Sequence, residues 1–264
     1  MTETLKKILF PIVTLVIILF VWDWTILLFH VPNYLVPRPW TVISALTSGY
    51  IIEGNLWPQL AYTCESVVLG YVMGCAVGIC VGALLAESRL LEIFTYPIVV
   101  AFKSTPKVAL APLVMVWCGF GIESKIVMVA LVCFFPLFVN TFVGLRQTNQ
   151  DQIDLMRVYA ATKSHIFMNV KLPSALDMIF AGLQISIVMA LIGAIVAEFV
   201  ASSQGLGYVI SSNSVDLHLG TMFAAILSLS LLGVIGNTLV RHLQLKLVFW
   251  GGEAQQDSVV IGTA

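Results

Sequence analysis

Charged side chains are scarce in this sequence. Asp, Glu, Lys and Arg make up only 10% of the 264 residues, whereas 59% of the residues are hydrophobic. A soluble domain carries about 25% charged residues, so this chain has too few of them to cover a surface that faces water. The formal net charge of −1 gives no support to nucleic-acid binding. The composition therefore predicts a protein whose main solvent is the lipid bilayer.

Patterns for metal binding, disulfide formation and catalysis are missing as well. The five cysteines form no CxxC pair and have no histidines nearby, so we expect them to pack as small hydrophobic residues between helices. The sequence contains no HExxH, no GxSxG and no Walker A motif. The sequence therefore gives no support to these types of catalysis or to nucleotide binding by a Walker A loop.

Long apolar runs, in contrast, are abundant. A helix needs about 20 mostly apolar residues to cross the hydrocarbon core. Six runs qualify: 8–29, 60–86, 106–121, 124–145, 178–201 and 221–245. The first is longer than the apolar region of a signal peptide and lacks a cleavage site, so we expect a retained helix. The third is short and either begins at residue 106 or, as a tilted helix, near residue 92.

The basic residues test this topology. With six spans and the N-terminus inside the cell, eleven of the thirteen Lys and Arg residues fall in cytoplasmic segments. Only Arg38 and Lys125 fall in external segments. The cytoplasmic set is Lys6, Lys7, Arg89, Lys103, Lys107, Arg146, Arg157, Lys163, Lys171, Arg241 and Lys246. The positive-inside rule therefore favours six spans with both termini in the cytoplasm.

Two external segments follow from that topology. Residues 30–59 are rich in proline and aromatic residues, as expected of an interfacial loop with Trp40 and Trp57 near the headgroups. Residues 202–220 contain glycines and serines but no basic residue. This second segment is either a flexible external turn or a short re-entrant element.

Small residues recur every four positions in the second and fifth spans. Such a stripe allows another helix backbone to approach closely, so both helices are expected to pack inside the protein. The stripe in the second span includes Gly70, Gly74, Gly78 and Gly82, and the stripe in the fifth begins at Gly182 and Ser186.

Two acidic residues lie within the apolar spans. Glu65 and Glu198 each lie about one turn inside the outer end of a span, and the stripe through Ser186 runs on to Glu198. Charged groups in a membrane usually face protein or water. Both carboxylates, together with Ser186, are candidates for a transport pathway. The alternative places the carboxylates at the headgroup boundary, bonded to nearby backbone or serine.

Prolines interrupt the region before the third span. Pro106 and Pro112 each remove a helical hydrogen bond, and a helix break at membrane depth is tolerated where the backbone faces protein or a watery cavity. The break could thus line the inner part of a pathway. Alternatively, the prolines only turn an amphipathic cytoplasmic helix, at about 88–103, into the third span.

The longest cytoplasmic segment is 146–177. Its apolar residues predict two short amphipathic helices, the first capped by Asn149 or Asp151 and the second by Ser164. The second helix is expected to end before Pro173. Such a pair suits docking into a groove of a partner protein, and a helix lying on the membrane surface is the alternative.

This segment resembles the "EAA" coupling loop of ABC-importer permeases, whose pattern is Glu-Ala-Ala, three residues, Gly, nine residues and Ile-x-Leu-Pro. Asp154-Leu155-Met156 occupies the first position, Ala160 the glycine position and Leu172-Pro173 the end. Ala160 departs from the family where a turn with positive φ would favour glycine. The resemblance assigns coupling contacts to Asp154, Leu155, Met156, Arg157, Tyr159, Ala160, Ala161, Thr162, Lys163, Ser164, Leu172 and Pro173.

The flanking stretches 110–146 and 170–210 resemble permeases of the nitrate/sulfonate/taurine type, and the resemblance extends over about 55–245. It implies an all-α membrane protein with the MetI-like permease fold, six transmembrane helices and one permease domain over 1–264. It also implies a homodimer in the bacterial inner membrane, two cytoplasmic ATPase subunits and a periplasmic or lipid-anchored binding protein. The chain itself would be non-catalytic and without a cofactor, because ATP and Mg would be bound by the ATPase.

Two other classes of protein are alternatives to a permease. A secondary transporter driven by an ion gradient often shows internal repeats and ionisable groups at mid-membrane, and neither is evident here. An intramembrane enzyme would need a catalytic or ligand pattern, but the four histidines lie in loops or at helix ends. The resemblance therefore implies import of a small anionic or polar solute that the binding protein delivers.

Overall fold

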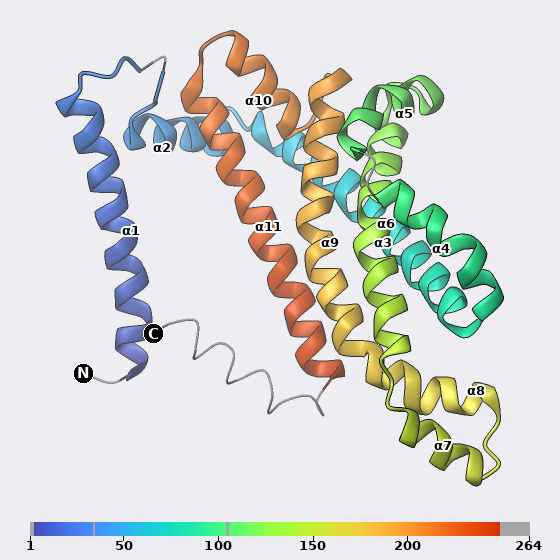
Figure 1. Ribbon diagram of the computed structural model, residues 1–264. Coiled ribbons are helices and arrows are strands. Elements are labelled where there is room, and N and C mark those ends of the chain that lie inside the picture. The colour runs from blue at the N-terminus through green and yellow to red at the C-terminus, as the bar shows by residue number, and fades with distance from the viewer. Residues whose placement is uncertain (1–2, 34, 104–105, 249–264) are drawn as a thin grey trace. The chain divides into compact units, whose positions relative to one another are not determined.

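The chain is helical throughout the part that the structure, a computed structural model, describes: residues 3–33, 35–103 and 106–248. This confirms the all-α prediction (Figure 1). The helices are α1 (Glu3–Leu28), α2 (Pro39–Thr47), α3 (Leu56–Glu87), α4 (Arg89–Lys103), α5 (Ala111–Cys118), α6 (Ile122–Arg146), α7 (Gln150–Val158), α8 (Lys163–Ile166), α9 (Leu172–Ala201), α10 (Leu206–Val215) and α11 (Leu219–Leu247). Two π-helical turns, η1 (Ser48–Ile52) and η3 (Phe167–Lys171), and one 3₁₀ turn, η2 (Lys107–Leu110), join them.

Apolar helical segments coincide with the predicted spans. Four are long and apolar enough to cross a bilayer: Leu56–Glu87, Ile122–Arg146, Lys163–Val200 and Leu219–Leu247. Two shorter apolar segments, Ile12–Leu28 and Lys107–Cys118, match the first and third predicted spans. The chain is therefore a multi-pass membrane protein, and the count of six spans agrees with its helices.

The chain divides into two compact units. The first contains residues 1–63 and 203–230, and the second contains residues 64–202 and 231–264. The assignment of residues 1–264 to a single permease domain stays a prediction. The C-terminal tail after residue 248 lies outside the described residues.

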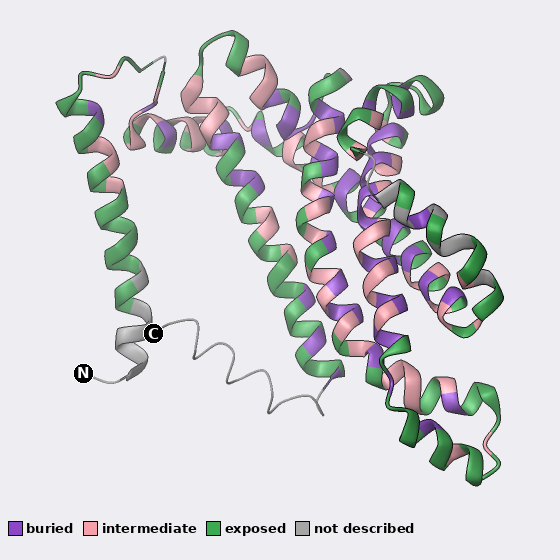
Figure 2. Ribbon diagram, in the orientation of Figure 1, coloured by how far each residue is buried: buried purple, intermediate pink, exposed green. Residues whose placement is uncertain are grey.

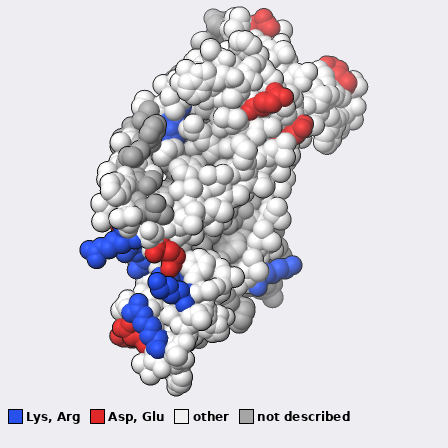
Figure 3. Space-filling model, turned by 90° about the vertical axis from the view of Figure 1, so that its right-hand side faces the viewer, with Lys and Arg blue, Asp and Glu red and all other residues white. Residues whose placement is uncertain are grey.

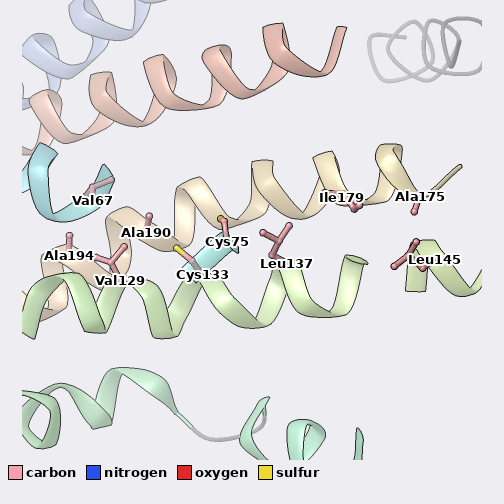
Figure 4. Packing of buried hydrophobic residues seen from close by; sticks show 10 residues of the cluster. All are labelled: Val67, Cys75, Val129, Cys133, Leu137, Leu145, Ala175, Ile179, Ala190 and Ala194. Atoms are coloured by element: carbon pink, nitrogen blue, oxygen red, sulfur yellow. The ribbon is translucent and has the colours of Figure 1, made fainter. Parts of the chain in front are cut away.

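Helices α6 and α9 form the centre of the second unit. They pack antiparallel, because Gly193 lies beside Val129 at one end while Gly144 lies beside Ala175 at the other. A buried hydrophobic cluster joins them to α3 and includes Cys133 of α6 and Cys75 of α3 (Figure 4). Small residues permit this close approach. Ala190 and Ala194, from the stripe in α9, are fully buried.

The glycines of α3 lie against the backbone of α6. A Cβ atom added at Gly78 would come within 2.9 Å of the carbonyl oxygen of Phe134, and one at Gly82 within 2.9 Å of that of Phe138. At Gly74 an added Cβ would overlap the backbone of Ala130. Because contacts advance in the same direction along both helices, α3 and α6 run parallel and leave no space for a side chain between them.

The third predicted span is divided in the structure. Helix α4 covers Arg89–Lys103, as the expected helix at 88–103 requires, and η2 and α5 follow after the break. Pro106 caps η2 in an extended conformation, and Pro112 occupies the first turn of α5. A proline is tolerated there because the first N–H groups of a helix have no partner within the helix. Ser104 and Thr105 lie outside the described residues.

The first unit contains α1, α2, η1 and α10. Most apolar side chains of α1 are exposed, as expected of a helix in contact with lipid (Figure 2). Asp23 in α1 forms an ion pair with Arg38, which donates from Nε at 2.9 Å and from Nη2 at 2.8 Å.

Residues 202–220 contain a folded helix, α10, with a buried N-terminal end, and whether this helix re-enters the membrane stays a prediction. The backbone N–H of Gly205 donates to Gln59 Oε1 at 2.6 Å, and that of Leu206 donates to Thr63 Oγ1 at 2.8 Å. Both acceptors belong to the first turns of α3. Side chains of the first unit thus satisfy two of the N–H groups that a helix start leaves unpaired.

Candidate functional site

The loop between α6 and α9 folds as two short helices with defined ends. Asn149 caps α7, since its Oδ1 accepts from the backbone N–H of Asp151 at 2.8 Å. Thr162 caps α8 through a bond from the N–H of His165 at 3.3 Å. The prediction of Asn149 is confirmed, whereas the assignment of Ser164 as the second cap is wrong. Ser164 lies inside α8, because Thr162 in its extended conformation already occupies the position before the first turn.

Helix α7 ends in a Schellman motif that has alanine in place of the usual glycine. The N–H of Ala160 bonds to the carbonyl oxygen of Arg157 at 2.9 Å, and the N–H of Ala161 bonds to that of Met156 at 3.0 Å. This motif requires a left-handed residue after the cap, and Ala160 has φ = 54°. The chain thus forms a left-handed turn at the position where the family pattern has glycine. This conformation costs an L-residue about 1–2 kcal/mol.

The second loop helix continues into α9. The expected end before Pro173 is wrong, because α8, η3 and α9 form one uninterrupted helical run. Pro173 cannot donate a hydrogen bond to the residue four positions earlier, and the wider π-helical turn absorbs that loss. Ser174 Oγ donates to the carbonyl oxygen of Val170 at 2.8 Å, which satisfies another acceptor in this turn.

Apolar side chains on the loop helices are exposed. Leu155 is 57% exposed and Val158 is 83% exposed. Tyr159 and Met168 are exposed too. A groove of about 660 Å³ lies between α7 and the start of α9, with Leu155 and Met156 on one side and Pro173 on the other. Exposed apolar side chains are unfavourable on a loop that faces water, so this surface is suited to burial against a partner.

Most of the Lys and Arg side chains visible in Figure 3 lie at the same end of the second unit, together with some acidic side chains. Lys171 Nζ lies 2.6 Å from Glu87 Oε1, which links η3 to the end of α3. Arg146 pairs with Glu92, which links α6 to the first turn of α4. Asp154, at the first position of the family pattern, pairs with Arg157 within α7 at 2.9 Å. The ion pairs between helices thus connect the two ends of the loop segment, Lys171 and Arg146, to α3 and α4.

The opposite end of α6 and α9 contains two buried charged residues. Lys125 is 0% exposed and Glu198 is 1% exposed. Lys125 Nζ donates to the carbonyl oxygen of Phe120 at 2.7 Å, and Glu198 is close enough to attract it electrostatically. The bond to Phe120 holds Lys125 against the turn between α5 and α6. Glu198 is enclosed by protein in this structure, and its place in a pathway or at the headgroup boundary stays a prediction.

The burial of Lys125 was not predicted from the sequence, where the residue was assigned only as one of two external basic residues. Its position inside an apolar run was the one feature that could have indicated burial. Of the other candidates for the pathway, Glu65 is exposed on α3, whereas Ser186 is fully buried between α6 and α9. The structure does not bring Glu65 and Ser186 together with the loop residues, and their place in a pathway stays a prediction.

Comparison with known proteins supports the resemblance. Residues 78–248 match the family described as binding-protein-dependent transport system inner membrane component. A formylaminopyrimidine transport permease of Halalkalibacterium halodurans is 31% identical, over 91% of this chain and 95% of its own. The taurine transport permease of Escherichia coli is 27% identical, over 95% of this chain and 92% of its own.

The fold has a counterpart among solved structures. A chain of the MetNI methionine ABC transporter, solved in inward-facing conformations, aligns with a TM-score of 0.55 at 21% identity. The alignment covers 78% of this chain and 98% of the other. At this level of identity the match supports the fold alone. The matched fold agrees with the predicted MetI-like arrangement.

Proposed function

Because this chain belongs to the family of binding-protein-dependent transport system inner membrane components, we propose that it is the permease subunit of an ATP-driven importer and that its α7–α8 loop is the contact with the ATPase. One observation supports this assignment above the others. The loop carries exposed Leu155 and Val158 on a short helix whose end is fixed by the turn at Ala160, at the spacing of the family pattern from Pro173.

The proposed orientation places this loop in the cytoplasm and both termini on the same side. The distribution of basic residues supports it, since eleven of thirteen would then be inside. In this arrangement two copies of the chain surround one pathway, and each loop seats on one of two ATPase subunits. ATP and Mg bind to the ATPases, and the permease contributes no catalytic group.

Motion would pass from the ATPase to the spans through the loop. Nucleotide binding draws the ATPase subunits together and displaces the surface on which α7 and α8 rest. Because the ion pairs of Lys171 with Glu87 and of Arg146 with Glu92 link the loop to neighbouring helices, the displacement reaches several spans at once. The transporter then alternates between two states as a rigid-body switch biased by ligand.

The solute is proposed to be small and polar or anionic. Two relatives are named as transport permeases, one for formylaminopyrimidine and one for taurine. The first compound is a neutral heterocycle and the second is a sulfonate. A separate binding protein on the outer side would select among such solutes and deliver them to the permease.

Substitutions on α7 test the docking surface. Leu155→Asp and Val158→Asp place a charge on exposed apolar positions that only a partner would bury, so both variants should insert into the membrane yet lose co-purification with the ATPase. Val215→Asp is the matched control, because Val215 is 80% exposed at the end of α10. Retention of the ATPase by both α7 variants would contradict the docking role. Solute uptake without any ATPase would instead favour a secondary transporter.

A further inference from the structure

The first unit contains a pocket of about 780 Å³. Its walls come from two segments, residues 33–55 and residues 217–221. Both segments belong to the stretches that the distribution of basic residues places outside the cell. The volume is within the range of about 300–1,000 Å³ that is typical of binding pockets. The pocket is therefore large enough to accept more than one side chain of a partner.

One carboxylate in this pocket is held in a fixed orientation. Ser48 Oγ donates to Glu53 Oε1 at 2.6 Å, and Asn55 Nδ2 donates to Glu53 Oε2 at 2.6 Å. Each oxygen of a carboxylate has two lone pairs, so each keeps one for a further donor. The positive φ of Gly54 (69°) turns the chain so that Asn55 reaches back to Glu53.

The wall that carries Glu53 is tied to its surroundings. The hydroxyl of Tyr50 donates to Ser228 Oγ in α11 at 2.8 Å, and Trp57 Nε1 donates to the carbonyl oxygen of Tyr50 at 3.0 Å. The rings of Tyr50 and Trp57 also meet edge to face at 5.1 Å. Side chains locked in this way lose little conformational entropy when a partner binds.

The two segments that line the pocket are in close contact with each other. A Cβ atom added at Gly220 would lie 3.0 Å from Thr41 Cγ2 and 3.2 Å from the carbonyl oxygen of Thr41. His218, the neighbouring residue of this wall, has its backbone N–H bonded to the carbonyl oxygen of Asn213 at 2.9 Å. Both walls are thus preformed, and the pocket does not depend on a partner to create it.

The charge of the lining indicates what the pocket accepts. Among the described residues that line it, Glu53 is the one acidic residue, and none is Lys or Arg. A fixed carboxylate with free lone pairs matches a guanidinium or an ammonium group. An anionic solute would be repelled by the same carboxylate. The lining therefore favours a basic group presented from the outer side.

We propose that this pocket receives an Arg or Lys side chain, carried on a surface loop of the solute-binding protein, and that Glu53 is its counter-ion. This inference depends on the proposed function, because it assumes that such a binding protein exists. It goes further by assigning the docking contact to one residue and by stating the charge of the group that the partner must present.

The test measures the affinity of the cognate binding protein for the complete transporter, permease with ATPase, reconstituted in lipid nanodiscs. Glu53→Gln keeps the shape of the side chain and should weaken binding about tenfold at low ionic strength, with a smaller loss at high salt. Ser44→Trp fills the pocket without a change of charge and should weaken binding at every salt concentration. Asp216→Asn, an acidic residue of the same unit outside the pocket lining, is the matched control and should bind as the parent does.

The outcomes separate this inference from the proposed function. If the parent transporter binds its binding protein and Glu53→Gln binds equally well, the inference is overturned while the proposed function stands. An equal loss in Asp216→Asn would overturn it too, because a diffuse negative surface would then explain the binding. Direct binding of free solute that depends on Glu53 would assign the pocket to solute instead. Failure of the parent to associate with any ATPase would count against the proposed function itself.

Discussion

Cys133 and Ser186 exchange hydrogen bonds across the contact between α6 and α9. Cys133 Sγ donates to the carbonyl oxygen of Ser186 at 3.3 Å, and Ser186 Oγ donates to the carbonyl oxygen of Cys133 at 3.1 Å. Both residues are fully buried between α6 and α9. Each side chain thus adds a bond to a carbonyl of the facing helix, and the pair fixes the register of the two helices.

Removal of one of these bonds should weaken the packing of α6 on α9. Ser186→Ala is expected to lower the free energy of unfolding by about 0.5–1.5 kcal/mol, the value of one interhelical hydrogen bond. Ser230→Ala is the control, because the exposed Ser230 hydroxyl bonds only within its own helix, to Ile226 at 3.0 Å. Thermal unfolding in detergent gives the comparison, and equal melting temperatures for the two variants would refute the role of the pair.

The glycines of α3 allow a matched comparison of alanine substitutions. Gly74→Ala should destabilise the protein by several kcal/mol, because its Cβ would overlap the backbone of Ala130, which cannot move alone. Gly233→Ala adds the same methyl group, but its nearest neighbour is the end of the Leu191 side chain at 2.9 Å, which can rotate away. Gly233→Ala should therefore cost much less. Similar losses in yield and melting temperature would show that the α3–α6 contact is not tight.

Two buried threonines should respond in opposite ways to valine. Thr141 Oγ1 is buried and has no hydrogen-bond partner, so Thr141→Val removes an unsatisfied group at constant shape and should be neutral or stabilising. Thr63 Oγ1 accepts the N–H of Leu206. Thr63→Val should therefore cost about 1–3 kcal/mol, because it leaves that buried N–H unpaired. Unfolding of both variants under one condition gives the test, and a loss at Thr141 as large as that at Thr63 would contradict it.

The turn at Ala160 should be improved by glycine. Ala160→Gly relieves the left-handed strain and should stabilise the end of α7 by about 1 kcal/mol. Ala160→Val should destabilise it, since a branched side chain tolerates positive φ poorly. Hydrogen exchange of the α7 amides reports the change directly. Faster exchange in Ala160→Gly would mean that the turn does not limit the stability of this helix.

The buried charges at the end of α9 should behave as a coupled pair. Lys125→Met or Glu198→Gln alone is expected to destabilise the protein, because each removes the attraction between two buried opposite charges. The double variant should cost clearly less than the sum of the two. A double-mutant cycle on unfolding free energies measures this coupling, and additive losses would show that the two residues act separately.

The sequence predicts much of this fold because length and hydropathy determine the spans. Apolar runs identified all six segments, and Asn149 was recognisable as a cap from its position before an amphipathic run. The sequence alone could not decide whether Thr162 or Ser164 caps α8, since both residue types cap helices. Only the backbone conformation before the first turn decides between them. The continuity through Pro173 depends on a π-helical turn, for which the sequence carries no clear signal.

The same limit applies to the sites. The spacing from Asp154 to Pro173 revealed the loop because it is a local pattern. The Lys125–Glu198 pair and the pocket around Glu53 unite residues that are far apart in the sequence, and nothing in the local composition links them. Long-range pairs of this kind require the packing of α6 on α9, or of the two segments of the first unit, before they can be seen.

The helical run through η3 has a mechanical consequence. The 38 residues of Lys163–Val200 are helical throughout, although the run changes direction where α8 meets α9 (Figure 1). The π-helical turn η3, instead of a flexible linker, joins the two helices. A displacement of α8 would therefore move the start of α9 with it and reach the span that ends near Glu198.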